Sequence, residues 1–395
     1  MRVLTVREKK EAINLMREIN VDPYGIKIML PKTEFFLLKV NSLKSTAANI
    51  LKQEILSLGA DLALSKNSLN LKTKKTDCLL MGTRTQLSSL ASKLKRQPFG
   101  LEETGKKIIE TIDNYAKKDF VLRTKRYSLD LEKKSLIMAI VNLTPDSFSQ
   151  DGLYGAPPDY ILSKIESLIE EGADVIDLGG ESSRPGSRQI SAKEELSRIM
   201  PVLKRISKRV KVPISVDTRK AEVAKAALEN GADIINDISG LKDKRMPQII
   251  SAQKGAVVIM HMLRTPLTMQ DNPYYNNLMD EIAQDLKLKI DKAQFAGIGR
   301  SSIVIDPGIG FGKNLKHNLE ILKKLPELKS LGKPIMVGVS RKSFIGKLTG
   351  AKVDNRLTGT ISACVISRLN GAKIFRVHDV KETKEALLVA DKILE

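Results

Sequence analysis

Eight apolar runs in the sequence end in polar or charged residues that could carry out chemistry. These residues are Asn142, Glu181, Asp217, Asn236 with Asp237, His261, Asp306, Ser340-Arg341-Lys342, and Arg376 with His378. Any one of them could be a buried structural residue, but eight such endings in order favour a shared functional site. This arrangement is typical of a barrel whose active site lies at the carboxyl ends of its strands.

Three of these residues suit a flat heterocycle. Asp217, Asn236 and Asp306 carry planar groups that donate or accept hydrogen bonds. A heterocycle with several N–H and C=O groups would match them. A buried site of this kind discriminates strongly between ligands, because a wrong ligand leaves polar groups unpaired.

A second set suits a phosphate or pyrophosphate. Lys342, Arg376 and His378 are cationic or can become so, and arginine can bind two oxygens at once. Asn142 offers a neutral oxygen that could hold Mg²⁺ alongside phosphate oxygens. The two sets together indicate a heterocyclic substrate that bears a phosphate leaving group.

The apolar runs predict eight strands with helices between them. The strands are expected at 136–142, 173–180, 213–217, 233–236, 256–261, 302–306, 334–340 and 372–378. Their interiors are almost continuously Val, Ile, Leu and Met, as expected of parallel strands covered on both faces. The pattern Gly-Ala-Asp-Val/Ile-Ile occurs at 172–176 and 231–235, where each glycine would end a helix before the next strand. We therefore predict a (β/α)8 barrel over residues 126–395.

Residues 1–125 predict a separate, small α/β domain. Helices are expected at 6–19, at 46–59 with Ser45 as the cap, from Thr83 or Thr85 to 96, and at 101–118 as a connector. Strands are expected at 34–40, 62–64 and 78–81. No catalytic constellation is visible here, so we expect a docking or dimerisation role.

Composition restricts the class of protein. The 395 residues carry a net charge of +20, which makes nucleic acid a candidate partner, but Trp is absent and aromatic residues are 4 %. A base-stacking surface is therefore poorly supported, and a solvated basic surface or an anionic substrate explains the charge better. The two cysteines are far apart, and no run of about 18 apolar residues could span a membrane, so we expect a cytoplasmic protein.

The glycine-rich stretch from Gly308 to Lys313 resembles a phosphate-binding loop only superficially. The spacing before Gly312-Lys313 is one residue too short, and Asn314 stands where Ser or Thr would bind Mg²⁺. We expect a tight turn here instead, with Phe311 placed to cover a ligand. His317 follows in a helical stretch and is expected to be structural.

The strand-end motifs resemble those of dihydropteroate synthases, in order, from about residue 135 to the C-terminus. The matching motifs are Asn142-Leu-Thr-Pro-Asp-Ser-Phe-Ser149, Gly179-Gly-Glu-Ser-Ser-Arg-Pro-Gly186, Ser215-Val-Asp-Thr218, Ile235-Asn-Asp237, Met260-His-Met262, Ile305-Asp-Pro-Gly-Ile-Gly-Phe-Gly-Lys313, Gly338-Val-Ser-Arg-Lys-Ser343 and Arg376-Val-His-Asp379. Residues 1–125 lie outside this resemblance.

The resemblance implies a TIM barrel that joins 4-aminobenzoate to 6-hydroxymethyl-7,8-dihydropterin diphosphate in folate synthesis, through a pterin cation. The residues that would bind the pterin diphosphate are Ser183, Asp217, Asn236, Met260, Asp306, Lys342, Arg376 and His378, with catalytic roles for Asp217, Lys342, Arg376 and His378. Phe148, Ser183, Pro185, Phe311 and Ser343 would line the aminobenzoate side. Asn142 would ligate Mg²⁺, and a homodimer through barrel helices is implied.

Two departures from the family pattern bear on the aminobenzoate side. Ser183 stands where threonine is common, which keeps the hydroxyl and removes a methyl group. The first loop reads Ser149-Gln-Asp-Gly152 instead of Ser-Asp-Gly-Gly, so either Gln150 or Asp151 could be the polar residue of that loop.

Three alternatives remain open from the sequence. A pterin-binding methyltransferase would share Asp217, Asn236 and Asp306 but would not need the phosphate-binding set. A synthase could use a different arylamine. The basic first domain could also serve a nucleic-acid-binding or scaffolding protein, which salt-dependent RNA binding by residues 1–125 would show.

Overall fold

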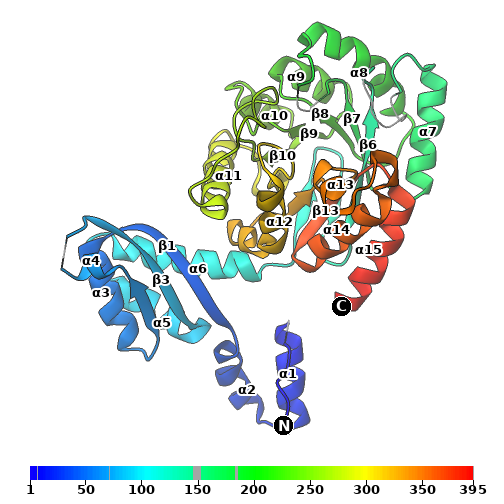
Figure 1. Ribbon diagram of the computed structural model, residues 1–395. Helices are drawn as coiled ribbons and strands as arrows, with labels where there is room; N and C mark the ends of the chain where they lie inside the picture. The colour runs from blue at the N-terminus through cyan, green and yellow to red at the C-terminus, as the bar shows by residue number, and fades with distance from the viewer. Residues whose placement is uncertain (7, 71, 146–152, 183–185, 395) are drawn as a thin grey trace. The chain divides into compact units, whose positions relative to one another are not determined.

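The computed structural model describes residues 1–395 except 7, 71, 146–152, 183–185 and 395. The chain divides into two compact units, Met1–Ala116 and Lys117–Glu395 (Figure 1). The division therefore falls earlier than the boundary at 125/126 expected from the sequence.

The first unit is a three-stranded antiparallel sheet with helices packed on one face. The strand order is β1 (Phe35–Lys44), β3 (Lys75–Thr83), β2 (Asp61–Leu64). Helices α3 (Ser45–Leu56), α5 (Arg84–Leu94) and α6 (Leu101–Ala116) contribute to its core with Leu62, Cys78 and Leu80 of the sheet. The remaining elements are α1 (Lys9–Glu18), α2 (Pro23–Met29), η1 (Leu30–Lys32) and α4 (Lys66–Leu69).

Two expectations for this unit need correction, and one is confirmed. The Thr83 side chain caps α5 in a reciprocal pair with Gln86, as one of the two expected caps. Ser45 does not cap α3, because its hydroxyl donates to the Thr73 carbonyl at 2.6 Å. Helix α6 is an integral part of the core rather than a connector, since Ile108 and Ile112 are buried.

The second unit confirms the predicted (β/α)8 barrel. Its parallel strands are β6 (Leu136–Asn142), β7 (Val175–Gly179), β8 (Ile214–Asp217), β9 (Ile234–Asp237), β10 (Ala256–Met260), β11 (Ile303–Asp306), β12 (Ile335–Val337) and β13 (Ala372–Val377). Each strand pairs with its successor, and β13 pairs with β6 to close the barrel.

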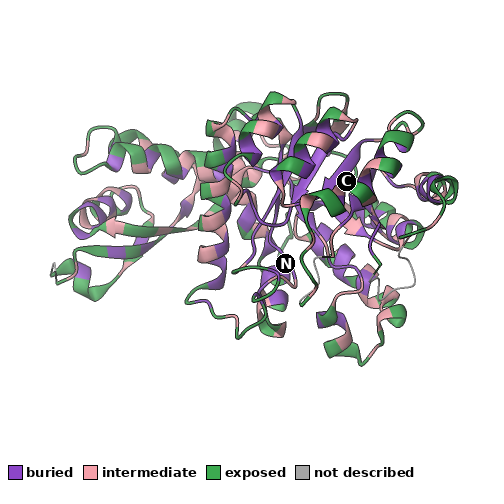
Figure 2. Ribbon diagram, turned by 90° about the horizontal axis from the view of Figure 1, so that it is seen from above, coloured by how far each residue is buried: buried purple, intermediate pink, exposed green. Residues whose placement is uncertain are grey.

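Helices surround this barrel, and buried residues concentrate on its strands (Figure 2). The helices are α7 (Pro158–Glu170), α8 (Ala192–Ile206), α9 (Ala221–Glu229), α10 (Met246–Ala252), α11 (Leu278–Phe295), α12 (Leu315–Lys323), α13 (Ser343–Thr349), α14 (Leu357–Leu369) and α15 (Val380–Leu394), with short turns η2 (Arg300–Ser302), η3 (Leu325–Leu331) and η4 (Val353–Asn355). Gly172 and Gly231 have φ of 109° and 104°, as expected of glycines that end helices.

Alternate strand residues face opposite sides, so the barrel has two separate apolar layers. Ile176 and Leu178 of β7 pack outward with the helices. The inward set, which includes Met138, Val258 and Met336, packs against a hairpin of β4 (Val121–Arg123) and β5 (Ser128–Asp130). No pattern in the sequence predicted these three-residue strands. The hairpin therefore fills the amino end of the barrel, and polar residues occupy the carboxyl end.

The glycine-rich stretch after β11 forms the expected tight turn. Gly308, Gly310 and Gly312 have φ of 70°, 83° and 65°, a region that side chains disfavour. A Cβ on Gly308 would lie 2.0 Å from the carbonyl oxygen of His261. Glycine is therefore required at Gly308 by both conformation and space.

We expect Gly308→Ala to destabilise the barrel more than Gly350→Ala, which is a matched control. Gly350 has a φ of 74°, but nothing lies within 4 Å of its added Cβ. Both variants carry the cost of a left-handed residue, roughly 1–2 kcal/mol. Denaturant titration should show a further loss of about 1–3 kcal/mol in Gly308→Ala from overpacking. Equal losses in the two variants would contradict the steric requirement.

Candidate functional site

Arg376 lies at the centre of the polar cluster at the carboxyl end of the barrel. Its Nε donates to Asp177 Oδ2 at 2.6 Å, and its Nη2 donates to Asp217 Oδ2 at 2.9 Å. Asn236 Nδ2 lies 3.3 Å from the same oxygen of Asp177. Strands β7, β8, β9 and β13 thus place an arginine between two carboxylates and an amide.

Asp177 is the functional candidate that sequence reasoning missed. It lies inside β7 rather than at its end, and its side chain is fully buried. A buried carboxylate in an apolar strand requires a charged partner, which Arg376 provides. Among the described residues, Asp177 Oδ1 and the neighbouring Ser215 Oγ are buried without a hydrogen-bond partner. Asp177 Oδ1 can accept a hydrogen bond from a polar ligand, and the Ser215 hydroxyl can donate or accept one.

Burial controls the protonation of the carboxyl groups in the cluster. It raises the pKa of Asp217 to about 7, although the charge of Arg376 opposes that shift. Burial also raises the pKa of Asp306, again opposed by a cation, here Lys342. The carboxyl of Asp306 is oriented by the backbone N–H of Gly308, at 2.6 Å from its Oδ1.

Lys342 joins the cluster from the turn before α13. Its ammonium group donates to the carbonyl of Ile309 and lies 4.5 Å from the centre of the Phe311 ring. Burial lowers the pKa of Lys342 to about 8, while Asp306 opposes the shift. The side chain therefore keeps most of its charge at neutral pH and places that charge over an aromatic face.

An apolar pad accompanies these polar groups. Met260 at the end of β10 is buried in a cluster with Ile238, Met262 and Met269, and Phe311 packs against it. A flat ligand could rest on this pad while its edge meets the polar groups. The structure thus places Phe311 against both the Met260 cluster and Lys342, and the expected ligand roles of these three residues stay predictions.

His378 and Asn142, the expected ligands of the diphosphate and of Mg²⁺, lie at the carboxyl ends of strands β13 and β6. His378 directly follows β13, and its Nδ1 lies 3.0 Å from Ser340 Oγ. Asn142 ends β6, and its Oδ1 lies 3.5 Å from the position of a Cβ on Gly179. Because Gly179 lacks a side chain, the Asn142 oxygen keeps open space beside it. Ser343 is exposed at the start of α13.

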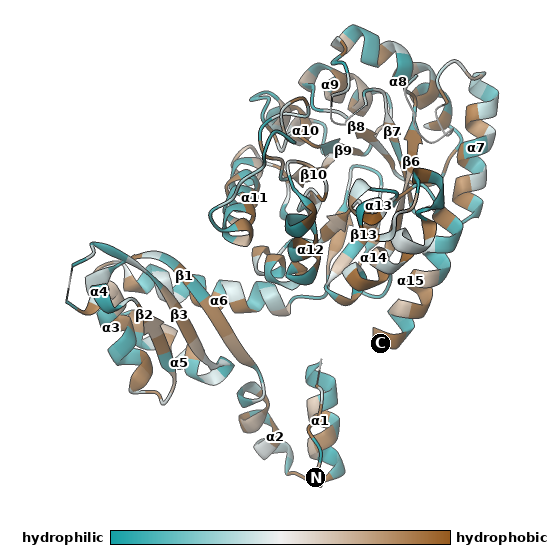
Figure 3. Cartoon of the chain, in the orientation of Figure 1, coloured by the Kyte–Doolittle hydropathy of each residue, from teal (hydrophilic) through white to brown (hydrophobic). Residues whose placement is uncertain are grey.

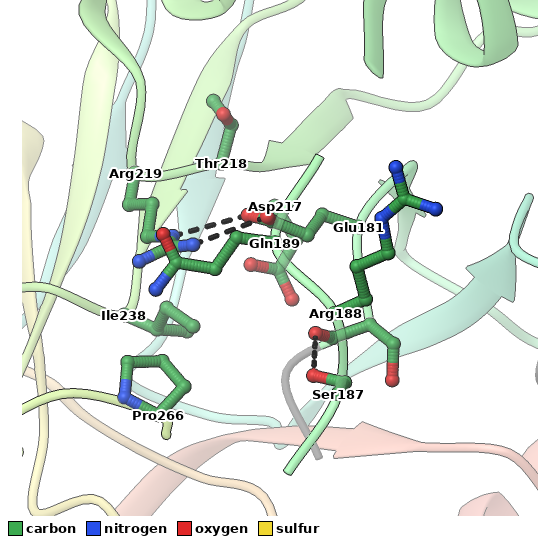
Figure 4. Close-up of a pocket in the computed structure, with 10 residues that line it drawn as sticks. Glu181, Ser187, Arg188, Gln189, Asp217, Thr218, Arg219, Ile238 and Pro266 are labelled. Atoms are coloured by element: carbon green, nitrogen blue, oxygen red, sulfur yellow. Dashed lines mark hydrogen bonds and ion pairs between the residues drawn. The ribbon is translucent and has the colours of Figure 1, made fainter. Parts of the chain in front are cut away.

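A separate ion-pair cluster lines the rim of the pocket next to Asp217. Arg219 donates to both carboxylate oxygens of Glu181, at 3.0 and 3.1 Å (Figure 4). Lys220 lies 3.0 Å from Glu181 and also pairs with buried Glu195. Because these ion pairs occupy both carboxylate oxygens of Glu181, we interpret this residue as structural rather than ligand-binding.

Lys313 and His261 form a second buried structural pair. Lys313 Nζ lies 2.9 Å from His261 Nδ1 and donates to the carbonyl of Phe311 at 3.0 Å. Burial lowers the pKa of Lys313 to about 7 and that of His261 to about 2. Lys313 therefore fixes the turn that presents Phe311, which agrees with rejecting a phosphate loop. His317 is structural as expected, because it pairs with Asn314 at the start of α12.

Part of the expected aminobenzoate side lies outside the described residues. Phe148, Ser183 and Pro185 are among these, together with Gln150 and Asp151. Their expected roles stay predictions. Phe311 and Ser343 are the members of that set that the structure places.

Comparison with known proteins defines the class of this barrel. The sequence model of a family described as "Pterin binding enzyme" matches residues 138–378. A solved dihydropteroate synthase from Yersinia pestis, in a sulfonamide drug complex, superposes with a TM-score of 0.67 at 40 % identity, covering 70 % of this chain and 99 % of that one. The Escherichia coli dihydropteroate synthase is 42 % identical over 68 % of this chain and 94 % of its own length. The chain therefore belongs to the dihydropteroate synthase family.

One relative extends the similarity into the first unit. A Halobacterium salinarum protein named "Probable bifunctional folylpolyglutamate synthase/dihydropteroate synthase" is 37 % identical over 96 % of this chain. The chain spans 46 % of that relative's length. Residues 1–116 are thus not peculiar to this chain, although the sequence resemblance covered only the barrel.

Proposed function

We propose that the barrel condenses 4-aminobenzoate with 6-hydroxymethyl-7,8-dihydropterin diphosphate to give 7,8-dihydropteroate and pyrophosphate. The observation that carries this proposal is the placement of Arg376 between Asp177 and Asp217. Arg376 belongs to the expected phosphate-binding set, and its contact with Asp217 connects that set to the expected heterocycle-binding set. A solved relative from Thermus thermophilus, 38 % identical with a TM-score of 0.62, is described in complex with 4-aminobenzoate, which supports this arylamine.

The proposed reaction exchanges one bond at the pterin methylene carbon. The bond from this carbon to the diphosphate oxygen breaks, and pyrophosphate leaves with the electron pair. The amine nitrogen forms the new bond to carbon and releases one proton. Arg376 and His378 would offset the charge that develops on the leaving group. Ionised Asp217 would stabilise the positive charge that develops on the pterin.

Magnesium fits this site as an ion shared with the diphosphate rather than one held by the protein alone. No group of three or more His, Cys, Asp or Glu side chains suited to a metal occurs in the part of the chain that the structure describes. Asn142 provides one neutral oxygen with open space beside it. Mg²⁺ commonly keeps waters and binds few protein ligands plus substrate phosphates. It would supply charge neutralisation of the leaving group.

We expect Asn142→Ala to raise the Mg²⁺ concentration needed for half-maximal turnover by at least roughly tenfold, since even the loss of a residue that supports a metal ligand weakens metal binding that much. The reason is the loss of the single protein oxygen offered to the ion. Titration of Mg²⁺ at saturating substrates would measure the shift, with Asn370→Ala as an off-site amide control. An unchanged Mg²⁺ dependence would remove Asn142 from the metal site.

We also propose that the barrel forms a homodimer and acts in the cytoplasm. Helices α14 and α15 expose Ile366, Leu369, Leu388 and Ile393, with exposed fractions of 47–71 %. An apolar surface on adjacent helices suits a symmetric interface. Light scattering would test the dimer, and a monomer at micromolar concentration would refute it. Cys78 and Cys364 are free and buried, as suits a reducing compartment.

Pyrophosphate binding separates this proposal from a pterin-dependent methyltransferase. Calorimetric titration with Mg²⁺-pyrophosphate should give saturable binding that weakens in His378→Ala. The matched control is His317→Ala, since that histidine pairs with Asn314 at the start of α12 and belongs to neither expected substrate-binding set. If pyrophosphate does not bind, the phosphate-side assignment fails and a methyltransferase becomes the better hypothesis.

A further inference from the structure

The sheet of the first unit has an apolar face that no helix of its core covers. Phe35 and Leu37 of β1 are 65 % and 59 % exposed, and Leu79 of β3 is 36 % exposed. Their chain neighbours Phe36, Leu38 and Leu80 point to the other side and pack with the helices. The hydrophobic colour marks part of β1, whose other end is hydrophilic (Figure 3).

The strand register makes this face continuous. Leu37 lies opposite Met81, and Lys39 lies opposite Leu79. Leu79 in turn lies opposite Ala63 of β2. Side chains directly opposite each other have Cβ atoms about 5 Å apart, so these residues form one patch. We call Phe35, Leu37, Ala63, Leu79 and Met81 the open sheet face.

The surroundings of the open sheet face indicate a protein partner rather than a small ligand. Lys39 and Asp77 stand on the same side of the sheet and are exposed. A contiguous apolar patch with a charged rim is typical of a protein interaction site. Strand β1 lies at the edge of the three-stranded sheet, since within the described part of the chain its one partner strand is β3.

The identity of the partner follows from which relatives contain the first unit. The synthases from E. coli and Y. pestis align with 68 % and 70 % of this chain, and nearly all of their own length is used. The H. salinarum relative aligns with 96 % of this chain, and the aligned region is 46 % of that relative's length. Its name includes a second activity, folylpolyglutamate synthase. In that relative, a region similar to the first unit therefore accompanies a synthase that is named together with a second activity.

We propose that the open sheet face docks a folylpolyglutamate synthase domain. This proposal rests on the proposed function, because dihydropteroate keeps a free benzoate carboxylate. An enzyme that adds glutamate to this product must form an amide at that carboxylate. Docking would bring an enzyme of this class to the barrel that makes its substrate or its precursor.

The test mixes the full chain with the folylpolyglutamate synthase of the same organism, added as a separate protein. Calorimetry should detect a complex with a dissociation constant on the order of 1–10 μM, typical of a transient interface. Leu37→Lys should weaken it at least tenfold, and Phe35→Ser should act in the same direction. Leu69→Lys is the matched control, since Leu69 is 63 % exposed on α4 of the same unit, and it should bind normally.

Three outcomes would overturn the proposal. One is the absence of any complex at about 100 μM of each protein. Another is a complex that Leu37→Lys and Phe35→Ser leave unchanged. The third is that Leu37→Lys lowers the mass of the particle that this chain forms in solution without the partner protein. That result would assign the open sheet face to contact with a second copy of the chain. Aminobenzoate-dependent pyrophosphate release, measured on the same preparations, reports separately on the barrel and should be unchanged in all variants.

Discussion

Asp217→Asn should lower kcat/KM by roughly 10²–10³-fold while the barrel remains folded, which is the effect of removing one preorganised electrostatic contact. Asp217 ends β8, and one of its oxygens is held by Arg376 at 2.9 Å. Asparagine keeps the size and one acceptor oxygen but cannot carry the negative charge. Steady-state kinetics with both substrates varied would measure the loss. Near-normal turnover would contradict the charge-stabilising role of Asp217.

The pH dependence provides an independent readout of the same residue. Burial raises the pKa of Asp217 from 3.8 to about 7, so the ionised fraction of this carboxyl group changes most near neutral pH in the free protein. The kcat/KM of the wild type should therefore fall as pH drops below about 7, because protonation removes the stabilising charge. This acid limb should be absent in Asp217→Asn. An identical acid limb in the variant would assign the titration to another group.

The sign of the stability effect is opposite to that of an ordinary paired carboxylate. Because the folded pKa is raised, the folded chain binds more protons than the unfolded chain between about pH 4 and 7. The contribution of Asp217 to stability is therefore present below the unfolded pKa and is lost as pH rises through 7. Asp217→Asn should thus be at least as stable as the wild type at pH 8.

The second large effect is expected for Arg376→Met, which should lose about 3–5 kcal/mol of unfolding free energy at pH 8 as well as activity. This substitution leaves Asp177 and Asp217 buried without their cation, with side chains 0 % and 9 % exposed. Denaturant titration would measure the change. Arg245→Met is the control, because that arginine is exposed and water screens its ion pairs, so its loss should change the unfolding free energy little.

A second substitution separates buried charge from lost packing. Adding Asp177→Asn to Arg376→Met should restore part of the stability without restoring activity, because one uncompensated carboxylate is removed. The loss in the single variant should also shrink at pH 5, because the raised pKa of Asp217 lets that carboxyl group take up a proton there. If neither change restores stability, the loss comes from packing and the charge explanation is wrong.

The residues that the sequence predicted share a local signal. Asp217, Asn236 and Asp306 each end an apolar run, and parallel strands bring such ends together without any knowledge of contacts. The bounds of β6 agree with the predicted 136–142, because a long buried strand has a clear pattern. The barrel could therefore be predicted before its packing was known.

The residues that the sequence missed depend on long-range pairing. Asp177 gains its role from Arg376, which lies far away in the chain, and it does not end its strand. Ser45 has the residue type of a helix cap, but a tertiary contact to Thr73 takes its hydroxyl. The β4–β5 hairpin was missed because three-residue strands carry no periodicity. In each case tertiary structure decides between locally equivalent choices.

The most direct measurement is mass-spectrometric product detection together with pyrophosphate release, from the pterin diphosphate and Mg²⁺ with and without 4-aminobenzoate. We expect 7,8-dihydropteroate and pyrophosphate in equal amounts, both dependent on 4-aminobenzoate, and both strongly reduced in Asp217→Asn. Binding of the pterin diphosphate without formation of dihydropteroate would contradict the proposed condensation and point to a different acceptor.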